Sequence, residues 1–138
     1  MHAEPVEVAR NDWGVILDHD QWHTVELRWL PTTRDMADEG FKATLELLAT
    51  AGERVRPRFM LIDATEFDHE FGEGVMAWRD EHIIPRYGSA GVTRFAFIVP
   101  EGAPGTMESG GAPAVEGRAT FPTAWFSTRE RAYRWLAE

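Results

Sequence analysis

Three features of the 138-residue sequence predict an α/β fold with a mixed sheet of four to five strands. A short, nearly unbroken apolar run over residues 57–63 is typical of a central strand buried on both faces. Helical patterns lie on each side of this run, over residues 34–51 and about 73–84. Two alternating segments that precede residue 31 predict an N-terminal antiparallel hairpin, which is followed by parallel β-α units.

The strands before residue 100 are expected at residues 13–18, 24–30, 57–63 and 94–99. Residues 6–8 form either a short edge strand or part of a loose lead-in over residues 1–10. Pro85 is expected to break or kink the second helix, because proline cannot donate a backbone hydrogen bond.

Residues 100–120 are rich in glycine, proline and alanine and have little to bury, which predicts a long, mobile loop. A short strand at 121–126 and a helix that begins at the Ser127–Glu130 capping box complete the chain. If the crossovers are right-handed and the strands sequential, the helices gather mainly on one face of the sheet. The whole chain, residues 1–138, is expected to be a single domain.

Composition excludes several classes of function. The net charge of −9 opposes binding to nucleic acid and to anionic lipid. The absence of cysteine excludes disulfides, thiolate catalysis and thiolate metal sites. No apolar run reaches the roughly 18 residues that a membrane span needs. The N-terminus lacks the basic start and apolar run of a signal peptide, so a cytoplasmic location is expected.

Three stretches resemble the SpoIIAA-like family in their order and spacing: FMLID at 59–63, GVTRFAFIV at 91–99 and WFSTRERAYRWL at 125–136. This family comprises bacterial proteins related to STAS domains and, more distantly, to CRAL-TRIO lipid-binding domains. The resemblance covers most of residues 13–137 and implies a SpoIIAA-like fold and a non-catalytic binding or regulatory module. In the family's anti-sigma-factor antagonists a phosphorylatable serine follows the central strand. The matching residues 68–72 carry no hydroxyl group, so a kinase-operated switch is not expected.

The candidate ligand-binding residues follow the central strand, at the sheet edge where open α/β sheets bind ligands. They are Asp63, Thr65, Asp68, His69 and Arg86. Asp63 ends a strand, so we expect it to be mainly structural and to accept backbone N–H groups, while His69 and Arg86 touch the ligand. If the second helix folds back over the strand ends, Asp63, His69 and Arg86 meet in one cleft and could transfer protons on an acidic substrate.

No metal site is expected, because no pair of possible ligands has helical or hairpin spacing linked to a second pair. No cofactor is expected either. The glycines of Gly72-Glu73-Gly74 lack the third glycine of a dinucleotide fingerprint and the lysine of a P-loop.

Three functions stay open. The first is a non-catalytic module that forms a homodimer or binds a protein partner. The second, which is less favoured, is a cofactor-independent enzyme that uses the cleft after Asp63. The third is a carrier of an apolar small molecule, and the six tryptophans are consistent with this as well as with the homodimer. A buried titratable pair in a pocket would indicate the enzyme, and a deep apolar cavity under the long loop would indicate the carrier.

Overall fold

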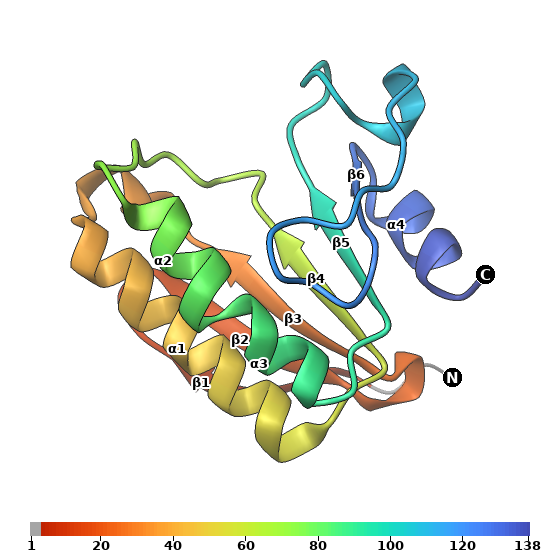
Figure 1. Cartoon of the computed structure of the whole chain (residues 1–138), viewed down its shortest axis with the longest axis horizontal. Helices are drawn as coiled ribbons and strands as arrows, with labels where there is room; N and C mark the ends of the chain where they lie inside the picture. Colours follow the sequence, from red (N-terminus) through yellow and green to blue (C-terminus); the bar gives the residue numbers. More distant parts are fainter. Residues whose placement is uncertain (1–3) are drawn as a thin grey trace.

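A six-stranded mixed sheet runs through the computed structural model, which describes residues 4–138 (Figure 1). The strands follow one another across the sheet in chain order: β1 (Val6–Arg10), β2 (Gly14–His19), β3 (Thr24–Trp29), β4 (Phe59–Asp63), β5 (Arg94–Ile98) and β6 (Thr123–Phe126). Strands β1, β2 and β3 pair antiparallel, and β3 to β6 pair parallel. The predicted hairpin and the parallel units that follow it are confirmed.

Four α-helices cover the sheet, and they lie on both of its faces: α1 (Asp38–Val55), α2 (Val75–His82), α3 (Ile84–Ser89) and α4 (Arg129–Leu136). Helices α1, α2 and α3 lie together on one face, hereafter the α1 face, and α4 lies on the opposite face, hereafter the α4 face (Figure 1). Among the described residues, no helix is long and apolar enough to cross a membrane.

Strand alternation explains the two faces. In β3, Val25, Leu27 and Trp29 belong to the core under α1, whereas Glu26 lies between them in sequence and bonds to Arg129 of α4. In β4, Leu61 packs in the smaller core on the α4 face. Strand β4 is therefore buried on both faces, as the sequence predicts, and in β3 Glu26 is buried on the α4 face as well.

The structure corrects the expected number of strands, whereas three of the four α-helices lie on one face, as expected. Residues 6–10 form a sixth strand instead of a lead-in, with Val6 opposite Asp18 of β2. An edge strand has to pair along only one of its two edges, so β1 can form although Val6 is 62% exposed. Helix α4 lies on the other face because it follows the last strand and connects no parallel pair, so the crossover rule does not constrain it.

The segment 100–120 is anchored to the rest of the molecule. Glu108 Oε1 accepts a hydrogen bond of 2.8 Å from the backbone nitrogen of Ser127. Ala114 forms an isolated antiparallel bridge with Thr123, the first residue of β6. This segment thus passes close to the sheet, and the expectation that it is a mobile loop stays a prediction.

Candidate functional site

An apolar cavity of about 390 Å³ lies on the α1 face, over strands β4 to β6. Its volume falls within the roughly 300–1,000 Å³ that is usual for small-molecule pockets. The floor consists of side chains that these strands direct to the α1 face: Ile62, Phe95, Phe97 and Trp125. The cavity exists because the two helical layers are offset. Helices α1 to α3 lie mainly over the first four strands, and α4 covers the last strands from the other side (Figure 1).

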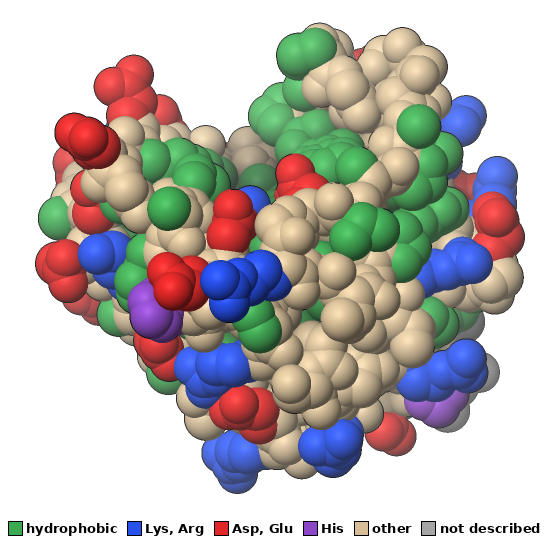
Figure 2. All heavy atoms as spheres, in the orientation of Figure 1, with side chains coloured by type: hydrophobic (Ala, Val, Ile, Leu, Met, Phe, Trp, Pro, Cys, Tyr) green, Lys and Arg blue, Asp and Glu red, His purple; other side chains and the backbone are tan. Residues whose placement is uncertain are grey.

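Helices α2 and α3 form one wall of the cavity, and loops form the opposite wall and the rim. The helices contribute Met76, Arg79, Ile84 and Tyr87. The loops contribute Ala64, Phe67, Phe71, Glu116 and Phe121. More than half of the lining residues are aromatic. Figure 2 shows a hollow at this end of the molecule, with hydrophobic side chains on both of its sides.

The rim after β4 is an aromatic cluster. The ring centroids of Phe41 and Phe71 lie 4.7 Å apart, and those of Trp29 and Phe67 lie 4.9 Å apart, both pairs edge to face. His69 belongs to the same cluster, with its ring centroid 5.5 Å from that of Phe71. Edge-to-face contacts of this kind stabilise aromatic pairs beyond the area that they bury.

A single carboxylate fixes this rim. Asp38, the first residue of α1, accepts a hydrogen bond of 2.8 Å between its Oδ1 and Nε2 of His69. Its two oxygens also accept the backbone N–H of Gly72, at 3.2 and 3.1 Å. These bonds from His69 and Gly72 favour the ionised form and lower the pKa of Asp38.

The charged residues of the cavity lining are Arg79 and Glu116, and they form an ion pair with an N–O distance of 4.0 Å. Arg79 also donates two hydrogen bonds, of 2.9 and 3.2 Å, to Oδ1 of Asp80. The Arg79 side chain is 21% exposed and that of Glu116 is 34% exposed. The pair therefore lies at the mouth of the cavity, between α2 and the long loop.

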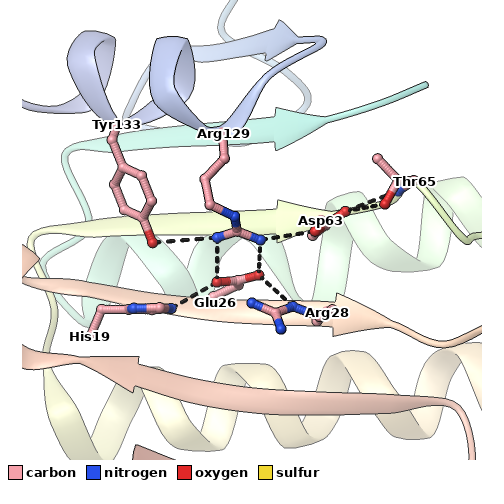
Figure 3. A network of polar contacts seen from close by, with 7 residues as sticks. All are labelled: His19, Glu26, Arg28, Asp63, Thr65, Arg129 and Tyr133. Carbon is pink, nitrogen blue, oxygen red and sulfur yellow. Dashed lines mark hydrogen bonds and ion pairs between the residues drawn. The ribbon is translucent and has the colours of Figure 1, made fainter. Parts of the chain in front are cut away.

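A network of charged side chains lies on the α4 face (Figure 3). At its centre Glu26 is fully buried and accepts two hydrogen bonds of 2.8 Å from the guanidinium of Arg129. His19 Nε2 lies 2.7 Å from Oε1 of Glu26, and Arg28 Nε donates to Oε2 at 3.2 Å. Burial alone would raise the pKa of Glu26, but the hydrogen bonds from His19 and Arg129 outweigh it and lower the pKa to about 2.

The same arginine links the network to Asp63. Oδ2 of Asp63 accepts a hydrogen bond of 2.9 Å from Arg129. Oδ1 accepts the backbone N–H of Thr65 at 3.1 Å and its hydroxyl at 2.6 Å. None of the seven residues in Figure 3 lines the cavity, so this network joins α4 to the sheet on the side away from it.

The structure does not bring Asp63, His69 and Arg86 into one cleft. Asp63 bonds to Arg129 on the α4 face, and His69 bonds to Asp38 at the start of α1. Arg86 donates to Glu53, near the end of α1, with bonds of 2.7 and 3.0 Å, and also pairs with Glu46. Asp38 and Glu53 are fifteen residues apart in one helix, or about 22 Å. The expected convergence fails because α3 lies along α1 and not over the strand ends.

The other two candidate residues, Thr65 and Asp68, also form hydrogen bonds within the fold. Thr65 closes the turn after β4 onto Asp63. The backbone N–H of Asp68 donates to Oγ1 of Thr33 at 2.9 Å. Of the candidate residues, His69 belongs to the aromatic rim of the cavity. Sequence reasoning missed the cavity residues themselves, although the alternate phenylalanines Phe95 and Phe97 were a visible signal of a large aromatic surface on one sheet face.

Comparisons of this chain with protein-family models, curated proteins and solved structures found no match. Within residues 4–138, no group of three or more histidine, aspartate or glutamate side chains lies together in a way that could hold a metal ion.

Proposed function

We propose that this protein is a non-catalytic binding module that holds an apolar small molecule in the cavity over β4 to β6. The cavity itself is the observation that carries the proposal: it is concave, largely aromatic and partly covered by the long loop. An apolar ligand would gain free energy there by leaving water, by about 25 cal/mol for each Å² of apolar surface that it buries. The loop that contributes Glu116 and Phe121 forms part of the cavity lining, where a carrier protein has to shield its ligand from water.

The catalytic alternative has less support from the geometry. Acid–base catalysis needs a titratable group within reach of the substrate. Glu26 and His19 lie on the α4 face, away from the cavity, and the hydrogen bonds of Arg129 and Arg28 already engage the carboxylate of Glu26. The charged pair of the cavity, Arg79 and Glu116, lies at its mouth instead of its floor.

A titration with N-phenyl-1-naphthylamine tests the proposal, because this neutral dye becomes fluorescent when it leaves water for an apolar site. We expect saturable binding of one dye per chain. The variant Ala64→Leu adds bulk to the cavity wall and should weaken dye binding at least about tenfold, since a well-filled site has no room for extra methylene groups.

Ala77→Leu is the matched control. Ala77 is exposed on α2 and does not line the cavity, so the same substitution there should leave the dye affinity unchanged. Absence of saturable binding to the wild-type protein, or equal effects of the two substitutions, would refute the proposal.

A second proposal concerns assembly: that the protein is a SpoIIAA-like module that forms a homodimer. The mixed sheet with its N-terminal hairpin supports the relationship. The edge strand β1 supports pairing between copies, because Val6 is 62% exposed and Val8 is 37% exposed along it. Sedimentation equilibrium should then give the dimer mass, and a monomer at high micromolar concentration would eliminate this proposal.

A further inference from the structure

The cavity lining includes a hydroxyl group that has no hydrogen-bond partner among the residues that the structure describes. Tyr87 of α3 is 3% exposed and lines the cavity. Its hydroxyl has no hydrogen bond to any other residue in the range 4–138, and no fully enclosed side-chain oxygen or nitrogen in that range lacks a partner. The hydroxyl must therefore have open space beside it. Because the cavity is the open space that Tyr87 lines, we infer that the hydroxyl faces it.

A second hydroxyl belongs to the lining of the same cavity. Thr123 of β6 is 4% exposed and lines the same cavity, and its side chain forms no hydrogen bond to another described residue. Both residues neighbour Phe95: the ring of Tyr87 lies 5.3 Å from that of Phe95, and Thr123 is opposite Phe95 in the pairing of β5 with β6. The lining thus includes two hydroxyl groups on residues beside Phe95, and a polar group that stays unpaired in such a site is costly.

The charges at the mouth make an ionised ligand unfavourable. Arg79 already has Asp80 and Glu116 as partners, so it does not offer an uncompensated positive charge. A buried ion without a partner loses its hydration free energy and gains no equivalent attraction. The net charge of −9 further disfavours an anion.

The lining also favours a flat ligand. Phe97 and Trp125 are stacked on the floor with an angle of 10° between their rings, and Phe95 and Phe121 are stacked with an angle of 18°. The rings within each pair are nearly parallel, and a planar ring system can extend a stack of this kind.

We propose that the ligand is a neutral molecule with a flat apolar ring system and one hydroxyl or carbonyl group, and that this group bonds to the hydroxyl of Tyr87, with Thr123 as the second polar contact. This inference rests on the proposed function, because it specifies the ligand of the same cavity.

Displacement of N-phenyl-1-naphthylamine by three related compounds tests the inference. Naphthalene has only the ring system, 2-naphthol adds a hydroxyl, and 2-naphthoate adds a negative charge. Each compound is titrated against the wild-type protein, Tyr87→Phe and the control Tyr133→Phe, whose hydroxyl lies on the α4 face beside Arg129.

We expect Tyr87→Phe to weaken 2-naphthol binding about fivefold, the effect of one hydrogen bond, and to leave naphthalene binding unchanged. Tyr133→Phe should change neither, and 2-naphthoate should bind most weakly to all three proteins. The melting temperature of Tyr87→Phe should match that of the wild type, because the lost hydroxyl has no partner in the fold.

The outcomes separate the two proposals. If 2-naphthol and naphthalene both bind and Tyr87→Phe affects them equally, the inference about Tyr87 is wrong and the proposed function stands. Preferred binding of 2-naphthoate overturns the neutral ligand in the same way. If the dye does not bind to the wild-type protein at all, both the proposed function and this inference fail.

Discussion

The two faces of the sheet bury their side chains in different ways. Strand β3 supplies Trp29 to the cavity on the α1 face and Glu26 to the charged network on the α4 face. On the α4 face the carboxylate of Glu26 accepts directional hydrogen bonds, and Glu26 is completely buried. On the α1 face rings pack without directional bonds and leave a cavity of about 390 Å³. The difference indicates that the charged network on the α4 face is structural and that the cavity on the α1 face is available for a ligand.

The largest expected effect is on the α4 face. Arg129→Ala removes two of the hydrogen bonds to the buried Glu26 and leaves only Arg28 and His19 beside its charge. It should lower the free energy of unfolding by about 3 kcal/mol, because the buried carboxylate loses its main cationic partner. Affinity for N-phenyl-1-naphthylamine should not change, as long as the variant is measured below its denaturation temperature. Chemical denaturation and dye titration measure the two quantities.

Arg134→Ala is the control in the same helix. Arg134 is 68% exposed and pairs with Glu130 one turn earlier, so its removal should cost less than about 0.5 kcal/mol. Equal losses of stability for the two variants would mean that the network has no special role.

Acid should remove the contribution of the network to stability. The pKa of Glu26 in the folded protein is about 2, below its ordinary value of 4.5, so the folded state favours the ionised form. The resulting stabilisation is present above pH 4.5 and is lost as the pH falls from 4.5 toward 2, with a size on the order of 3 kcal/mol.

Glu26→Gln measures this effect, because glutamine does not titrate. We expect the wild-type protein to be much the more stable of the two at pH 6 and this advantage to shrink steadily between pH 4.5 and pH 2. Denaturant midpoints at several pH values provide the comparison. A constant difference across this range would contradict the lowered pKa.

A smaller effect is expected at an ion pair that belongs neither to the cavity nor to the charged network. Arg86 pairs with Glu53 and Glu46 along the outside of α1, with its side chain 28% exposed. Arg86→Ala should lower the free energy of unfolding by about 1 kcal/mol, the upper range for partly exposed ion pairs. Dye affinity should stay the same. If dye affinity falls instead, the sequence-based expectation that Arg86 touches the ligand is right after all.

Periodicity in the sequence was sufficient to predict most of the strands and the buried side of each. It also predicted that Asp63 accepts a backbone N–H from the turn after its strand, and Thr65 donates that bond. The link between Asp63 and Arg129 was not predictable, because the two residues are 66 positions apart and α4 is free of the crossover rule.

The cavity could not be predicted for a related reason. Aromatic residues such as Phe97 and Trp125 were visible in the sequence, but aromatic side chains fill cores as readily as they line pockets. Whether space remains between them depends on how far α2 and α3 are offset from β5 and β6. That offset is a property of packing between layers, and local patterns do not encode it.

The most direct test of the difference between the faces is a titration of ¹⁵N-labelled protein with 2-naphthol, followed by amide chemical shifts. We expect saturable shifts at residues around the cavity, including Ala64, Tyr87, Phe97 and Trp125, and none at Glu26 or Arg129. Shifts confined to residues around Glu26 and Arg129, with the cavity residues unchanged, would contradict the assignment of ligand binding to the α1 face.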